Sequence, residues 1–217
     1  MHPPIPNLRA SDAIALHDRL LGTPGWPAAE PAPPPGPTWL WVQANHRCNS
    51  LLWAEEDLAR RSTVAAAEIA ANKRAIDGYN QARNDATERV DELLLVALGL
   101  VDEASARSDA PLSRPPAGAR LHSETAGSML DRLSIMSLKI QAMRAQTERS
   151  DVDAAHRNAS GVKLERLRQQ RQDLAGCLDA LLTDAAAGRT YFKVYRQFKM
   201  YNDPHFNPVL VQERLGA

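Results

Sequence analysis

The chain has 217 residues, of which 44% are hydrophobic and 24% are charged. Its 26 Lys and Arg residues are balanced by 26 Asp and Glu residues, so the formal net charge is zero. This composition is typical of a folded globular protein and excludes an intrinsically disordered chain. Because there is no excess of positive charge, nothing favours nucleic-acid binding or a general attraction to a membrane surface.

The sequence shows no targeting segment, no membrane span and no paired cysteine motif. Residues 1–4 read MHPP, with no basic segment before an apolar run, so we expect no signal peptide. No stretch reaches the roughly 20 apolar residues that cross a bilayer. Cys48 and Cys177 have no spacing typical of a disulfide framework or a zinc site. We therefore expect a cytoplasmic protein without a transmembrane segment.

Prolines divide the chain into regions. Ten of the 15 prolines lie in residues 1–37. Because proline breaks helix interiors, long helices are predicted in the two proline-free stretches, 38–110 and 117–203. We divide the chain into an N-terminal short helix with a Pro-rich spacer, residues 1–37, and a helical-bundle domain, residues 38–217. The first region should make few apolar contacts and be dispensable for folding.

Apolar residues recur at helical spacing through both proline-free stretches. They predict four long helices, at residues 38–61, 65–101, 127–149 and 153–187. The short turns between them make neighbouring helices antiparallel. A fifth, amphipathic helix is predicted over residues 190–201. The sequence thus predicts an all-α fold, an up-down antiparallel bundle of long helices with a short C-terminal amphipathic helix.

Five ordered blocks of sequence point to a known family. They are WAEED at 53–57 with Arg60, KRAID at 73–77, NQARND at 80–85, the run from Glu124 to Ile140, and KVYRQFKMYND at 193–203. Over residues 40–211 the chain resembles the bacterial domain-of-unknown-function family 4254. It departs at Ala54, where the family is expected to have His, and at Ala126, where Pro is expected. The resemblance implies a bacterial cytosolic protein often encoded near glycosyltransferases of envelope-glycan synthesis, and no established reaction.

Two arginines occupy core-facing positions of the predicted helices. Arg83 lies on the apolar stripe of helix 65–101, and Arg171 on that of helix 153–187. A buried guanidinium needs a carboxylate or a ligand anion, and Asp131 and Asp77 are possible partners. The sequence therefore predicts either an anion pocket inside the bundle or a buried ion network.

Two further groups of residues are candidates for binding an anion. Thr125 and Ser128 flank the start of helix 127–149, where free N–H groups can hold a phosphate if an arginine such as Arg132 is near. An ordinary hydroxyl cap is the alternative. Lys193 and Arg196 lie on the basic face of the predicted fifth helix, which can engage a phosphate, a membrane surface or an acidic protein partner. These charges are too few to indicate nucleic-acid binding.

One face of helix 38–61 carries several polar residues. They recur at spacings of three and four and are His46, Asn49, Trp53, Glu56 and Arg60. A lone His beside Trp is usually a structural side chain. The alternative is a polar site that contains His46, with Asn80 or Asn84 opposite it.

Carboxylates in the first two long helices suggest a metal-dependent alternative. They are Glu56, Asp57, Asp85, Glu88 and Asp91. Oxygen ligands suit Mg²⁺, which stabilises a transferring phosphoryl group. In a hairpin that turns near residue 63, however, Glu56 lies opposite Arg74, about 20 Å along the helix from Glu88. Ion pairing of the first two acids with Lys73 and Arg74 is the other interpretation.

The sequence favours an accessory binding protein that takes a phosphorylated or sugar-nucleotide ligand without a cofactor. The candidate ligand-binding residues are Arg83, Arg171, Thr125, Ser128, Asp131, Arg132, Lys193 and Arg196. A Mg²⁺-dependent nucleotide phosphohydrolase or transferase that uses the five carboxylates is one alternative. A structural module that docks on a protein partner is another. No catalytic residue is assigned.

Overall fold

The computed structural model describes residues 8–32, 34–197 and 205–215, which form six helices and one pair of two-residue strands. The elements are α1 (Ala10–Leu21), α2 (Pro37–Leu58), α3 (Ala66–Ala97), β1 (Arg120–Leu121), α4 (Ala126–Glu148), α5 (Ala154–Ala186), β2 (Thr190–Tyr191) and α6 (Pro208–Leu215). The all-α prediction is confirmed. In the described part of the chain, no helix combines the length and the apolar character needed to cross a membrane.

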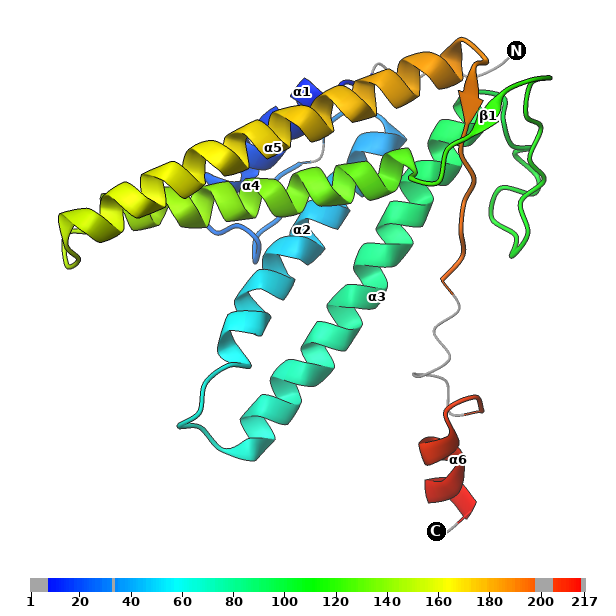
Figure 1. Ribbon diagram of the computed structural model, residues 1–217. Helices are drawn as coiled ribbons and strands as arrows, with labels where there is room; N and C mark the ends of the chain where they lie inside the picture. Colours follow the sequence, from blue (N-terminus) through cyan, green and yellow to red (C-terminus); the bar gives the residue numbers. More distant parts are fainter. Residues whose placement is uncertain (1–7, 33, 198–204, 216–217) are drawn as a thin grey trace.

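The four long helices form two antiparallel hairpins that cross each other (Figure 1). α2 packs along α3, and α4 packs along α5. Contacts between the two hairpins join α4 to both α2 and α3. The predicted hairpin of residues 38–61 and 65–101 is confirmed. Because the hairpins cross, the far ends of α2 and α3 extend beyond α4, and a recess forms where the three helices meet.

α1 belongs to the main core. Leu16 and Leu20 are buried in the same apolar cluster as Val42, Leu133 and Leu178. α1 contacts α2, α4 and α5. The short helix predicted in the N-terminal region is present, but the premise that this region makes few apolar contacts is wrong. We now expect its removal to destabilise the fold.

The helix predicted over residues 190–201 is not formed. Its first two residues make β2, which pairs in parallel with β1, and the chain continues to Gln197 without helix. Residues 198–201 lie outside the described residues. Phe192 and Val194 are buried, whereas their neighbours on either side are more exposed. A burial period of two is that of a strand, and aromatic and β-branched residues favour extended backbone. The short C-terminal helix is α6, further along the chain.

Candidate functional site

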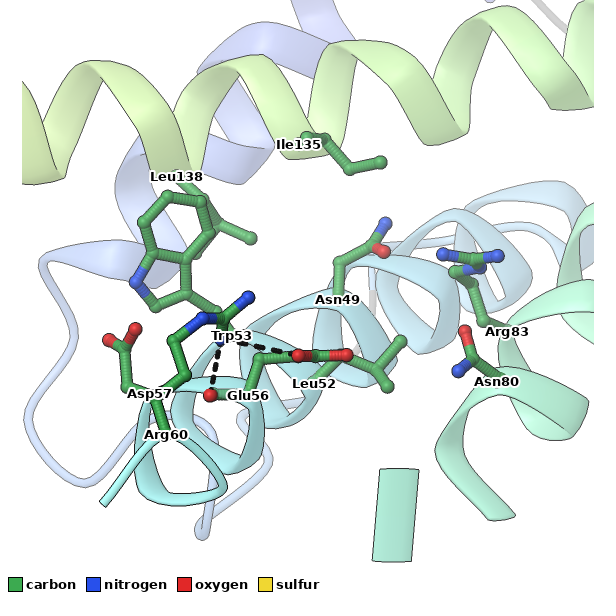
Figure 2. A pocket seen from close by; sticks show the side chains of 10 residues that line it. All are labelled: Asn49, Leu52, Trp53, Glu56, Asp57, Arg60, Asn80, Arg83, Ile135 and Leu138. Carbon is green, nitrogen blue, oxygen red and sulfur yellow. Dashed lines mark hydrogen bonds and ion pairs between the residues drawn. The ribbon is translucent and has the colours of Figure 1, made fainter. Parts of the chain in front are cut away.

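A cleft of about 310 Å³ opens between α2, α3 and α4 (Figure 2). Its lining residues are Asn49, Leu52, Trp53, Glu56, Asp57, Arg60, Asn80, Arg83, Ile135 and Leu138. Spacings of three and four residues place the α2 members on one face of that helix. The polar face predicted for helix 38–61 therefore forms one wall of this cleft. Asn80 also lines the cleft, but the predicted polar site that contains His46 is not formed. His46, the first member of that face, does not line the cleft.

The cleft has two chemically different ends. Figure 2 shows Trp53, Asp57 and Arg60 towards one end, and Arg83 with Asn80 towards the other. Side chains from α4 lie over the space between them. The combination of an apolar wall with a few polar groups is typical of small-molecule sites.

Arg83 has few partners for its guanidinium. Its Nη2 donates to Asn84 Oδ1 at 3.4 Å, and its Nε lies 3.9 Å from Asp131 Oδ1. Nε is buried and has no hydrogen-bond acceptor among the described residues. A guanidinium offers five N–H donors, so the described residues leave most of this donor capacity unused. The side chain is 27% exposed and lines the cleft.

A buried polar network lies behind Arg83. Asp131 Oδ1 accepts hydrogen bonds from Asn45 and Asn49 Nδ2, each at 2.9 Å. Asn49 Nδ2 also lies 3.0 Å from Ser134 Oγ, which is 2.7 Å from His46 Nδ1. Ser134 and His46 are fully buried, so no substrate reaches this serine–histidine contact. The network instead fixes the position of Asn49 in the wall of the cleft.

Arg171 lies elsewhere. Its Nη1 donates to Asp18 Oδ1 at 2.7 Å and to Ser137 Oγ at 3.1 Å. Arg83 and Arg171 are both partly buried and each has an acidic partner, as expected for a buried ion network. They do not share a partner, because Arg83 faces Asp131. The pocket predicted to contain both arginines is therefore not formed.

The start of α4 is satisfied by the protein itself. Ser128 N–H donates to Thr125 Oγ1 at 3.1 Å, and Thr125 N–H donates to Ser128 Oγ at 3.0 Å. Gly127 N–H donates to the buried carboxylate of Asp91 at 2.7 Å. The hydroxyl-cap interpretation is correct. A phosphate site is not formed here, because a carboxylate of α3 occupies the place of the anion.

The remaining basic candidates bind to other parts of the protein. Arg132 Nη1 contacts Glu124 Oε2 at 2.7 Å on the surface. Lys193 Nζ lies 5.9 Å from the centre of the Tyr191 ring. Arg196 is held by two carboxylates of α3 and by backbone carbonyls. None of these three side chains lines the cleft.

The five carboxylates of the metal alternative do not converge. Glu56 and Asp57 line the cleft, Asp85 accepts from Gln81, Glu88 accepts from Arg196, and Asp91 caps α4. Asp77, considered above as a partner of Arg83, pairs with Lys73. Across residues 8–32, 34–197 and 205–215, no group of three or more His, Cys, Asp or Glu side chains is placed to hold a metal ion.

The comparisons with known proteins give a single finding. Residues 39–194 match the model of the family described as protein of unknown function (DUF4254). This range contains every residue that lines the cleft. No curated protein and no solved structure matches the chain significantly. Since the family match covers more than half of the sequence, the chain belongs to the DUF4254 family.

Proposed function

We propose that this protein is an accessory binding protein that holds a phosphorylated or sugar-nucleotide ligand in the cleft between α2, α3 and α4. One observation carries the proposal: Arg83 lines the cleft, and the part of the chain that the structure describes leaves most of its donors unused. A partly buried guanidinium with spare donors is suited to an anion, and charge-assisted hydrogen bonds to phosphate are strong.

The rest of the cleft is consistent with a small polar ligand. Leu52, Ile135 and Leu138 supply apolar contact area, whereas Asn80 supplies an amide group that both donates and accepts hydrogen bonds. Arg60, the other arginine of the cleft, already contacts the carboxylate of Glu56 at 3.2 Å. Arg83 is thus the cation best placed to hold a ligand.

The wider setting of the proposal comes from the family resemblance. We propose that the protein acts in the bacterial cytoplasm and that its ligand belongs to cell-envelope glycan synthesis. A Mg²⁺-dependent phosphohydrolase or transferase is the weaker proposal, because its five carboxylates are spread over separate places: Glu56 and Asp57 line the cleft, whereas Asp85, Glu88 and Asp91 contact other parts of the protein. A protein-interaction module has one observation in its favour: Phe206, Val209 and Leu215, in and before α6, are all exposed.

Isothermal titration calorimetry tests ligand binding directly. The probes are inorganic phosphate, hexose 1-phosphates and uridine diphosphate sugars, each titrated into the full chain. Arg83→Met should weaken binding about 10- to 100-fold, the value of a hydrogen bond to a charged group. Arg168→Met removes an exposed arginine of α5 that pairs with Glu165 outside the cleft, and it serves as the matched control. Equal affinity in the wild type and Arg83→Met, or no binding of any probe, would exclude the proposal.

A further inference from the structure

We infer that the cleft takes a single pyranose ring that carries one phosphate, a hexose monophosphate, rather than a sugar nucleotide. This inference rests on the function proposed above and chooses between its two ligand classes. It depends on three properties of the cleft: its size, the distribution of charge along it, and the exposed indole of Trp53.

Size limits the ligand. Ligand sites in proteins have volumes of about 300–1,000 Å³, so a cleft of about 310 Å³ is at the lower limit. A hexose monophosphate has one ring and one phosphate. A sugar nucleotide adds a second phosphate, a ribose and a base, which would have to lie outside the cleft. The volume therefore favours the smaller molecule.

Charge limits the number of phosphates to one. At one end, Arg83 has donors to spare. At the other end, Arg60 is paired with Glu56, and Asp57 has no ion-pair partner among the described residues. A second phosphate extending from Arg83 along the cleft would approach Asp57 and be repelled. One anionic group, held at the Arg83 end, fits this distribution.

Hydrogen-bonding capacity orients the ligand. A carboxylate only accepts hydrogen bonds and a guanidinium only donates them. The end with Glu56 and Asp57 therefore requires ligand groups that donate, such as hydroxyls, whereas the end with Arg83 requires an acceptor such as phosphate. Asn80 lies beside Arg83, and its amide can both donate and accept. A polyhydroxylated ring with one phosphate meets both requirements along one axis.

Trp53 supplies the contact for the ring. Its side chain is 36% exposed and lines the cleft beside Leu138 (Figure 2). One face of a pyranose carries mainly C–H groups, so it can pack on an indole while its equatorial hydroxyls reach polar side chains at the edge. The carboxylate of Asp57, one helical turn along α2, is placed to accept from such hydroxyls. A nucleobase also stacks on an indole, and the experiment must separate the two.

The test compares ligands that differ by one group. Glucose, galactose and mannose 1-phosphates are titrated by calorimetry beside the free hexoses, inorganic phosphate, uridine monophosphate and uridine diphosphate glucose. At least one hexose 1-phosphate should bind ten or more times tighter than its free hexose, than inorganic phosphate and than both uridine compounds. Trp53→Ala should weaken that binding about tenfold or more, because the lost apolar contact is worth at least ~1.4 kcal/mol.

Control variants separate the outcomes. Leu40→Ala removes another exposed apolar side chain of α2 and should leave affinity unchanged. If Arg83→Met or Trp53→Ala fails to fold, the conservative variants replace them. Arg83→Lys keeps the charge and Trp53→Phe keeps an aromatic face, so each should retain part of the affinity for the hexose 1-phosphate. If a uridine compound binds tighter in an Arg83-dependent manner, or if Trp53→Ala has no effect, the hexose monophosphate is wrong while the proposed function stands. If no probe depends on Arg83, the proposed function itself is wrong.

Discussion

Asp91 Oδ1 accepts a hydrogen bond from the backbone N–H of Gly127 at 2.7 Å, across the junction of α3 and α4. Asp91 is buried, and its carboxylate lies at the first turn of α4, where the helix dipole favours a negative charge. The contact requires α4 to begin very close to α3. Glycine permits this approach, because it has no side chain to occupy the gap.

Gly127→Ala should destabilise the protein. An added Cβ would lie 2.5 Å from the backbone carbonyl oxygen of Thr87 and 2.9 Å from Asp91 Oδ2. The helices would have to separate, at a cost of about 1–3 kcal/mol, typical of overpacking. Gly161→Ala in α5 is the control, because its Cβ would meet nothing within 4 Å. That variant should gain about 0.5–1 kcal/mol from helix propensity. Urea unfolding measures the free energy of unfolding of both variants. An increase in both Gly127→Ala and Gly161→Ala would show that α3 and α4 are not in close contact at Gly127.

The ionisation of Asp91 should make stability fall as the pH rises. Burial raises the pKa of Asp91 to about 7, against hydrogen bonds from Thr125 and Gly127 that lower it. Because the folded-state pKa lies above the unfolded value, the stabilisation is complete at low pH and is lost as the pH rises towards 7. A shift from about 4 to about 7 corresponds to about 4 kcal/mol.

Comparison with Asp91→Asn isolates this contribution. The amide cannot ionise, so the free energy of unfolding of the variant should rise relative to the wild type between pH 4 and pH 8. Other titrating groups are shared by both proteins and cancel in the difference. A difference that stays constant over this range would show that Asp91 titrates normally.

The features that could be predicted from the sequence are those set by residues close together in the chain. The four long helices follow from apolar spacing and from the positions of proline, and the polar face of α2 follows from the same spacing. Asp131, one of the two partners considered for Arg83, is the carboxylate beside it. Asp18, the partner of Arg171, did not follow from the sequence, because that pair depends on how α1 packs against the hairpins. The helix predicted around Phe192 is wrong. Thr190, Phe192 and Val194 recur with the period of two that is typical of a strand, but the basic residues Lys193 and Arg196 suggested one face of a helix.

His17 should be replaceable with a gain in stability. Its ring stacks on that of His46, with centroids 4.4 Å apart, and neither of its nitrogens has a hydrogen-bond partner among the described residues. His17→Leu removes these unpaired groups and should add about 1–3 kcal/mol at pH 7. Substitution of the exposed His156 by Leu is the control. A loss of stability in His17→Leu would mean that the nitrogens are satisfied in solution.

The same histidines should make the fold sensitive to acid. Burial lowers the pKa of His46 to about 4, and burial, His46 and Arg171 lower the pKa of His17. Asp18, which is paired with Arg171, is the acidic group that opposes this effect at His46. Lowered histidine pKa values give stability that is present above about pH 6.5 and lost as the pH falls towards 4. The advantage of His17→Leu should therefore grow below pH 6.5, which unfolding curves at several pH values would show. This trend is opposite to that of Asp91.

Removal of α1 should lower the free energy of unfolding strongly, although the helix lies near the N-terminus. Leu20→Ala should lose about 2–5 kcal/mol, the range for a buried leucine, and a chain that begins at residue 23 should lose more. Val209→Ala in α6 is the matched control, because that side chain is exposed. Thermal and urea unfolding measure all three proteins. Full stability in the shortened chain would restore the view that the N-terminal region is dispensable.

Among the ion-paired arginines of the described residues, we expect substitution of Arg196 to lower the stability of the fold most. Its Nη1 lies 2.8 Å from Glu88 Oε2 and 2.6 Å from Glu92 Oε1, and its Nη2 donates to the carbonyl oxygens of Ala106 and Ser108. Only 14% of the side chain is exposed. The guanidinium thus fastens the segment after β2 to α3 and to the loop that precedes β1.

Arg196→Met should cost about 3–5 kcal/mol, because it leaves the largely buried carboxylate of Glu88 without a cation and leaves Glu92 with Arg89 alone. Arg196→Lys should lose an intermediate amount of stability. An ammonium keeps the positive charge, but it lacks the two separate Nη groups with which the guanidinium contacts carboxylates and carbonyl oxygens at once. Arg189→Met is the control: Arg189 pairs with Asp184 on the surface, and such a pair is worth about 0–1 kcal/mol. Urea unfolding ranks the three variants. If Arg196→Met proved no worse than Arg189→Met, the carboxylate of Glu88 would have to be solvated in the variant, and Arg196 would not be needed to hold the segment after β2 on α3.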